Sequence, residues 1–310
     1  MRFARYAWSV LAYNVLVILW GALVRATGSG AGCGNHWPLC NGELTPAFAS
    51  WKMAIEFTHR GMTGLDTLAV AVLVIWAFRA TPRGSLARRG AVLSAIFLVS
   101  EGLFGAALVL LQHVANDASP SRIYWLSAHF ANTLTLVACL ALTAWWAEGH
   151  EPPRLHGRVF WAGLAALVSL VAVGITGDIS ALGDTLFPSA SLAAGLARDF
   201  DPASNLIVRL RGLHPALAAC VGASVMIYAF SRGAAERNVR KLGYGVALAV
   251  VAQIGAGVLN LVLLAPVWMQ IVHLLLAEVV WIALVLLAVS PSDANSWDRL
   301  PTGARVANSR

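Results

Sequence analysis

Four histidines occupy matching positions in four separate apolar segments of this 310-residue chain: His59, His129, His214 and His273. Each lies roughly six to eight residues inside one end of its segment, which corresponds to about 9–12 Å of helix. An imidazole is a costly group in an apolar span, and histidines are common axial ligands of haem iron. One such histidine would indicate a hydrogen bond between helices. Four at one level predict axial ligands for two haems.

The composition excludes an ordinary water-soluble domain. Hydrophobic residues make up 58% of the chain and charged residues 12%, whereas soluble domains carry about 25% charged residues. The mean hydropathy is +0.70. These values predict a membrane protein with several spans. The net charge of +7 is therefore interpreted as a signal of membrane orientation, and no nucleic-acid partner is expected.

Eight apolar segments are close to or above the ~20 residues that a transmembrane helix requires. They cover residues 7–26, 53–78, 90–112, 123–147, 159–177, 206–230, 242–264 and 268–289. Lipid cannot hydrogen-bond to a peptide group, so these segments must be helical. The first is expected to be a span and not a signal peptide, because Arg25 and a glycine-rich run follow it in place of a cleavage site. The predicted fold is all-α, a polytopic membrane protein with eight transmembrane helices.

The basic residues predict how the chain is oriented in the membrane. Of the 22 Lys and Arg residues, 15 lie at one set of segment ends and 7 at the other. The larger set contains Arg2, Arg5, Arg79, Arg83, Arg88, Arg89, Arg154, Arg158, Arg232, Arg237, Arg240, Lys241, Arg299, Arg305 and Arg310. The positive-inside rule places this set, and with it both termini, in the cytoplasm. The loops at 27–52, 113–122, 178–205 and 265–267 then face outward.

A weak internal repeat divides the chain into two halves. Thr27-Gly28 in the first half matches Thr176-Gly177 in the second, and the segment 101–105 matches 253–257 at an offset of 152 residues. We therefore expect two tandem four-helix bundles, an N-terminal half at 1–150 and a C-terminal half at 151–310. The second and fourth helices of each half carry the histidines.

This arrangement predicts which histidines share a haem. The second and fourth helices of a half run in the same direction, so their histidines face each other across the bundle. A porphyrin can lie between facing helices in this way. The pairs are His59 with His129 and His214 with His273. Both haems would lie near the outer leaflet, with their propionates toward water.

Two cysteines and one acid add to the possible chemistry. Cys33 and Cys40 lie in the first outward loop, where an oxidising compartment favours a disulfide, either as a structural staple or for thiol exchange. Glu56 precedes His59 by three residues and shares its helical face. It is either a boundary charge that pairs with Arg60 or a general base beside the first haem. The matching place in the second half holds Arg211, so we expect the chemistry in the first half.

These motifs together resemble the haem A synthases. The Glu-x-x-His-Arg motif at 56–60 is similar to the one in their second span. The stretch ending at Arg25 and the following Thr27-Gly28 resemble their first span and loop. Further similar features are Trp37-Pro38, Gln253 with Gly257 and Asn260, and Leu213-His214-Pro215. The resemblance covers about residues 10–290 and is to the bacterial type with a cysteine pair in the first outward loop.

The resemblance implies an oxidoreductase that converts the C8 methyl group of haem O to a formyl group, giving haem A for terminal oxidases. It assigns His59 and His129 to the substrate haem and Glu56 to catalysis. It assigns His214 and His273 to the iron of a haem b cofactor. The implied partners are membrane lipid, the haem O synthase (a protohaem farnesyltransferase) and a quinone or other electron acceptor.

Two features depart from the family pattern. Glu101 stands where family members often have glutamine, and the loop at 178–205 is longer than the minimal form.

Three other functions remain open. One alternative is a quinol-linked di-haem b electron carrier that modifies no haem. Such a carrier would not need the asymmetry between Glu56 and Arg211. A disulfide-generating oxidoreductase would usually need a second outer cysteine pair. A proton-coupled transporter is the third alternative.

Overall fold

The computed structural model describes residues 2–153 and 157–291, and in this part of the chain the regular structure is helical. Arg154, Arg299, Arg305 and Arg310, which the orientation argument used, lie outside the described residues. The helices are α1 (Arg2–Ala26), α2 (Trp51–Ala80), α3 (Leu86–Leu110), α4 (Pro120–Ala147), α5 (Arg158–Leu186), α6 (Leu192–Asp199), α7 (Leu206–Arg211), α8 (Leu213–Ala235), α9 (Arg240–Val262) and α10 (Val267–Val289), with a 3-10 turn at Arg237–Val239. Eight candidate spans are long and apolar enough to cross a membrane within the described ranges. The prediction of an all-α protein with eight spans is confirmed.

Two predicted boundaries are wrong. The segment expected at 159–177 continues to Leu186, so Asp178 and Asp184 lie on α5 and not in a loop. Both acids have cationic partners on other helices, which favour their burial on α5: Asp178 is 3.9 Å from Arg25, and Asp184 is 3.1 Å from Arg211. The segment expected at 206–230 is divided at Gly212 into α7 and α8 and extends to Ala235.

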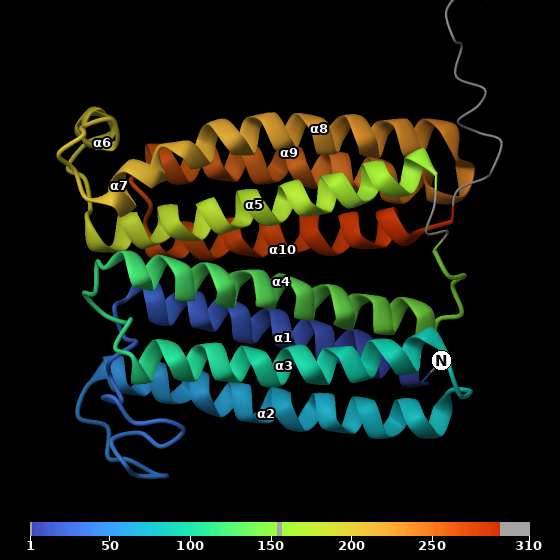
Figure 1. Ribbon diagram of the computed structural model, residues 1–310, viewed down its shortest axis with the longest axis horizontal. Helices are drawn as coiled ribbons and strands as arrows, with labels where there is room; N and C mark the ends of the chain where they lie inside the picture. Colours follow the sequence, from blue (N-terminus) through green and yellow to red (C-terminus); the bar gives the residue numbers. More distant parts are fainter. Residues whose placement is uncertain (1, 154–156, 292–310) are drawn as a thin grey trace, which may run out of the picture.

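The long helices lie side by side in two groups (Figure 1). One group contains α1, α2, α3 and α4, and the other contains α5, α8, α9 and α10, with α4 facing α5 and α10. The two groups share a core, because Trp281 of α10 packs within the cluster formed by the first group. Its indole Nε1 also donates a hydrogen bond of 2.7 Å to the carbonyl oxygen of Leu134 on α4. The groups therefore form one packed body.

Polar side chains start the helices at the end that carries the long loops. Ser50 caps α2 by accepting from the amide of Met53, and Ser119 caps α4 by accepting from Arg122, with Pro120 in the first turn. These are the residue types favoured at helix N-termini, because they satisfy amides that have no partner inside the helix.

The third helix of each group ends in the same way. The amide of His113 donates to Leu108 at 2.8 Å, and the amide of Ala265 donates to Asn260 at 2.8 Å. The preceding residues, Gln112 and Leu264, both have positive φ angles, 58° and 60°, as in a left-handed helix cap. The two endings are 152 residues apart, the offset found in the sequence. This agrees with a tandem duplication, which stays a prediction.

The first long helix begins, and the last long helix ends, at the same end of the bundle. In Figure 1, α1 begins and α10 ends on the right, whereas α6 and the loop between α1 and α2 lie on the left. The loops with the predicted outward orientation, now 27–50, 111–119, 187–205 and 263–266, all lie at one end. Which end faces the cytoplasm stays a prediction from the basic residues.

We expect α9 to tolerate bulk at Gly245 but not at Gly243. A Cβ atom at Gly243 would lie 2.6 Å from the carbonyl oxygen of Ala229 on α8, whereas one at Gly245 would have no neighbour within 4 Å. Gly243→Leu should therefore destabilise the protein by about 1–3 kcal/mol through overpacking. Gly245→Leu should have little effect or a small benefit, because the gain in helix propensity is the same at both sites. Thermal unfolding in detergent measures the difference, and equal melting temperatures would contradict this packing.

Candidate functional site

The four histidines lie at similar depth from the loop-bearing end of the bundle. His59 follows the start of α2 by 8 residues, His129 follows the start of α4 by 9, and His273 follows the start of α10 by 6. His214 is the second residue of α8, 8 residues after α7 begins. Each of the four is half-buried. The structure therefore brings the two histidines of each predicted pair onto the same group of helices.

The geometry of His214 and His273 fits a pair of axial ligands. Their ring centroids are 6.4 Å apart, and the ring planes are inclined at 82°. Metal–imidazole bonds are about 2 Å long, so two rings that bind one metal from opposite sides have centroids about 6 Å apart. The described residues contain no group of three or more His, Cys, Asp or Glu side chains that could hold a bare metal ion. A haem needs only two axial side chains, since the porphyrin supplies the other nitrogens.

Unpartnered ring nitrogens also mark these sites. The Nδ1 atoms of His59, His129 and His273 are buried and have no hydrogen bond, whereas Nδ1 of His214 lies 3.2 Å from the hydroxyl of Thr176. His59 and His129 are close enough for their charges to interact. Buried polar atoms without partners cost free energy, and since no hydrogen bond at Nδ1 holds these three rings, their orientation depends on packing.

Glycines on neighbouring helices make room for three of the rings. A Cβ atom at Gly21 of α1 would lie 3.0 Å from Cε1 of His59, and one at Gly177 of α5 would lie 2.9 Å from Cε1 of His214. Gly257 of α9 packs against His273 in the same manner, at 3.0 Å. Gly177 thus corresponds to Gly21, and the match of Gly177 with Gly28 made from the sequence is wrong. It failed because α5 continues past the expected loop boundary.

The functional meaning of Gly21 was missed from the sequence. A glycine inside an apolar helical pattern was the only available signal, and such a glycine often marks a close approach of another group. That signal does not say which side chain approaches. Only the packing of α1 against α2 identifies His59 as the neighbour.

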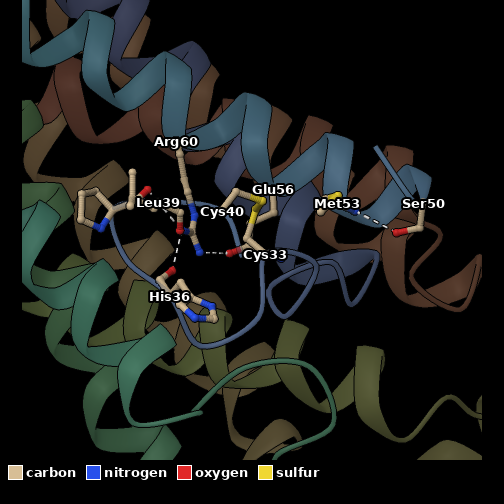
Figure 2. Close-up of a disulfide and its surroundings, with 9 residues drawn as sticks. Cys33, His36, Leu39, Cys40, Ser50, Met53, Glu56 and Arg60 are labelled. Atoms are coloured by element: carbon tan, nitrogen blue, oxygen red, sulfur yellow. Dashed lines mark hydrogen bonds and ion pairs between the residues drawn. A yellow bond between two sulfur atoms is a disulfide. The ribbon is translucent and has the colours of Figure 1, made fainter. Parts of the chain in front are cut away.

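Glu56 and Arg60 hold the first outward loop (Figure 2). Glu56 is 3% exposed, and its two carboxylate oxygens accept from the amide of Cys33 at 2.8 Å and from Arg60 at 2.5 Å. Arg60 also donates to the carbonyl oxygens of His36 and Leu39, both at 2.7 Å. The pair with Arg60, one of the two roles considered for Glu56, is present, and one oxygen of Glu56 is bound by Arg60 while the other is bound by the loop.

The predicted bond between Cys33 and Cys40 is confirmed, with an S–S distance of 2.01 Å. Both cysteines are buried, at 0% and 1% exposure, against Met53 and Phe57. Exchange with another thiol needs access to a sulfur atom. The burial therefore favours the structural staple over thiol exchange.

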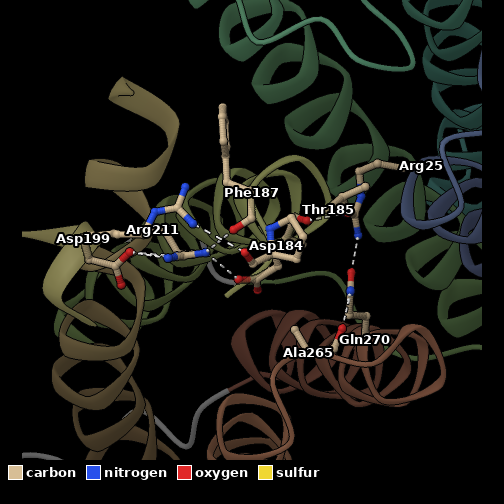
Figure 3. A network of polar contacts seen from close by, with 11 residues as sticks. Arg25, Asp184, Thr185, Phe187, Asp199, Arg211, Ala265 and Gln270 are labelled. Carbon is tan, nitrogen blue, oxygen red and sulfur yellow. Dashed lines mark hydrogen bonds and ion pairs between the residues drawn. The ribbon is translucent and has the colours of Figure 1, made fainter. Parts of the chain in front are cut away.

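Arg211 has a corresponding position in the second half (Figure 3). It is 7% exposed and donates to Asp199 of α6, at 2.8 and 2.6 Å, and to Asp184 of α5, at 3.1 Å. Glu56 and Arg211 each stand three residues before a histidine, and each fastens an outward segment. Arg211 does not share a continuous helix with His214, because Gly212 separates α7 from α8.

Arg25 connects the two groups at the same end. Its guanidinium donates to Thr185 of α5 and Gln270 of α10, both at 3.1 Å, and lies 3.9 Å from Asp178 (Figure 3). The contacts cross from α1 to both helices of the other group that face it. Arg25 therefore fixes the relative position of the groups close to the level of the histidines.

Glu101, which departs from the family pattern, lies beside His129. Its carboxylate is 3.5 Å from Nδ1 of His129 and accepts from the side-chain amide (Nδ2) of Asn132 at 2.6 Å and from the hydroxyl of Thr133. The 3.5 Å contact is within ion-pair distance but is not a well-formed hydrogen bond. In the other group, Nε2 of Gln253 lies 3.3 Å from Nε2 of His273.

Comparisons with known proteins identify a family whose match covers most of the chain. The family described as "Cytochrome oxidase assembly protein" (COX15-CtaA) matches residues 4–285. A Thermus thermophilus protein named protoheme IX farnesyltransferase is 48% identical over 293 residues, which cover 93% of this chain and 48% of that protein. The chain thus spans about half the length of this relative.

Two other relatives are named heme A synthase. The Halalkalibacterium halodurans protein is 36% identical over 166 residues, covering 53% of this chain and 54% of its own length. The Geobacillus kaustophilus protein is 46% identical over 96 residues, covering 31% of this chain and 30% of its own length.

We expect Arg60→Gln to loosen the first outward loop. The change removes the cation that joins Glu56 to the carbonyl oxygens of His36 and Leu39, and charge-assisted hydrogen bonds are worth about 1.5–3 kcal/mol each. Hydrogen exchange followed by mass spectrometry should show faster exchange of amides in the loop at 33–43. Lys52→Gln is the control, because Lys52 is an exposed cation near the same loop. Equal protection of the loop in both variants would contradict the assigned role of Arg60.

Proposed function

The chain belongs to the COX15-CtaA family of cytochrome oxidase assembly proteins, and from this membership we propose that it is a haem A synthase. The observation that carries the proposal is the placement of His59, His129, His214 and His273 as two pairs at one end of the helices. The substrate is haem O, and the proposed reaction converts its C8 methyl group to a formyl group through an alcohol in two successive two-electron oxidations. Water supplies the oxygen atom, and each oxidation releases two protons and passes two electrons to the acceptor. The chain has two functional halves, 1–150 and 151–310.

The N-terminal half binds the substrate. His59 of α2 and His129 of α4 hold the iron of haem O, and Gly21 allows the ring of His59 to lie close to α1. The disulfide loop covers the adjacent end of α2, where Glu56 and Arg60 fasten it. These contacts support a shielded site next to the outer leaflet, in which the substrate keeps one orientation.

The C-terminal half holds the permanent cofactor. His214 and His273 are the iron ligands of haem b, which supplies one-electron redox chemistry when bound. The ring separation of 6.4 Å and the close approach of Gly257 support this assignment. Electrons removed from the substrate leave through this half to a quinone or another acceptor.

Glu56 is the proposed catalytic residue. Its place one turn from His59 lets the carboxylate accept a proton released at the methyl carbon or stabilise positive charge there. The hydrogen bonds from Cys33 and Arg60 hold the carboxylate in one orientation. The same bonds also support a second role, in which Glu56 only fastens the loop.

The surroundings of the enzyme follow from the same proposal. It is a multi-pass protein of the bacterial cell membrane, with both termini in the cytoplasm and the haem sites toward the outer face. Haem O is made by a protohaem farnesyltransferase, which we propose as the partner that delivers it. The name of the Thermus thermophilus relative supports this choice, because this chain matches about half of that protein.

The assignment of haem b predicts a matched pair of glycine variants. Gly257→Val should displace His273, because an added Cβ atom at Gly257 would lie 3.0 Å from the ring. An added Cβ atom at Gly255 would have no neighbour within 4 Å. Purified Gly257→Val and His214→Ala should lose most of the reducible b-type absorbance, and Gly255→Val should keep it. A normal b-type spectrum in His214→Ala would show that this histidine is not the ligand.

The proposed activity is tested most directly at Glu56. Glu56→Gln keeps the shape of the side chain and removes its charge. If Glu56 is catalytic, the variant binds haem b normally but accumulates haem O or the alcohol, with haem A formation reduced by a factor of about 10² or more. Extraction and chromatography of the haems measure this ratio, and Lys52→Gln serves as the charge control. Unchanged haem A formation would assign Glu56 to the loop alone. A wild-type protein that forms no haem A would favour the di-haem electron carrier.

A further inference from the structure

The contact between Glu101 and His129 has features of a positioning interaction. The carboxylate of Glu101 faces Nδ1 of the imidazole at 3.5 Å, and its side chain is 15% exposed. Asn132 and Thr133, on the same helix as His129, both donate to this carboxylate. Asn132 also donates to the carbonyl oxygen of Phe97 on α3. The two donors on α4 therefore hold the carboxylate beside the ring, and Asn132 also joins α4 to α3.

The matching residue in the other half has a different chemical character. Gln253 is 152 residues after Glu101, and it contacts Nε2 of His273 rather than Nδ1. Nδ1 of His273 has no hydrogen bond, and Nδ1 of His214 faces the neutral hydroxyl of Thr176. Among the four span histidines, all of them described by the structure, His129 has an acid at Nδ1. The two halves therefore differ at an equivalent place beside the fourth-helix histidine.

We propose that Glu101 is a positioning residue that accepts the Nδ1 proton of His129 and makes it a more strongly donating iron ligand than His273. This rests on the proposed function in one respect, the binding of a haem by His129. A carboxylate at Nδ1 fixes the tautomer that leaves Nε2 free for the metal, and it raises the basicity of the ring.

The consequence is a direction for electron transfer. A more basic axial ligand stabilises ferric over ferrous iron, so the haem in the first half has the lower reduction potential. Electrons then flow from the substrate side toward the haem between His214 and His273. A carboxylate on one side and an amide on the other produce this difference within two similar bundles.

The test compares Glu101→Gln with Glu278→Gln in protein loaded with protohaem at both sites. Glu278 of α10 is 1% exposed, and its carboxyl oxygens have no hydrogen bond. Glu278 is close enough to Glu101 for their charges to interact. The described contacts of Nδ1 of His129 include Glu101 but not Glu278. Glu278→Gln is therefore a control for the loss of a nearby buried acid. The readouts are the reduction potentials of both haems and the electron paramagnetic resonance spectrum of the ferric low-spin iron.

We expect Glu101→Gln to keep both haems, to raise the potential of the first haem and to shift its resonance spectrum, with the second haem unchanged. Glu278→Gln should leave the spectrum of the first haem as in the wild type. If Glu101 served only to join α3 to α4, Glu101→Gln would lower the melting temperature without moving the potential or the spectrum, and the proposal would be overturned.

Thr133→Val provides a second variant if Glu101→Gln does not fold. It removes a donor from the carboxylate of Glu101 without removing the charge, which leaves that carboxylate more basic. The potential of the first haem should then move in the opposite direction, downward, and an upward shift or none would contradict the proposal. His129→Ala separates this inference from the proposed function. If His129→Ala loses no haem relative to the wild type, the proposed function is wrong at this site.

Discussion

Every polar group inside a membrane-spanning helix must find its partner within the protein, because lipid offers none. Near the loop-bearing end of this molecule the requirement is met by charged contacts that also determine the architecture. Arg25 joins α1 to α5 and α10, and Arg60 joins α2 to the disulfide loop. Several buried polar atoms still have no hydrogen bond, among them Nδ1 of three span histidines and both carboxyl oxygens of Glu278. These charged contacts therefore join the helices that carry the span histidines.

Close packing of helix backbones against the histidine rings is a second constraint on the structure. Helices of this length can pack closely only where small residues allow it, and three glycines are used to bring a helix backbone against a histidine ring. This contact limits the rotation of the ring toward the neighbouring helix. Trp281 of α10 packs against the first group and donates a hydrogen bond to α4. The packing of the two groups is therefore coupled. The histidines are thus held by a rigid frame.

The two halves perform similar structural tasks with different charges. An acid, Glu56, fastens the outward segment of the first half, and a base, Arg211, fastens that of the second. An acid, Glu101, faces the fourth-helix histidine of the first half, and an amide, Gln253, faces that of the second. Duplicated bundles can differ in function through such substitutions without a change of fold. The first half accumulates acidic groups near its histidines, which suits a site where protons are released.

The sequence by itself determined the helical class, the eight spans and the four histidines, because hydropathy, helix length and rare polar residues in apolar segments are local properties. It also indicated the disulfide, since Cys33 and Cys40 are close in the chain. The tertiary structure decided where α5 ends, since Asp178 and Asp184 on its last turns are paired with Arg25 and Arg211 of other helices. It also decided that Gly21 faces His59 and that Glu101 faces His129. These contacts join separate helices, and their rotation and depth depend on how all the side chains pack together, which no local pattern specifies.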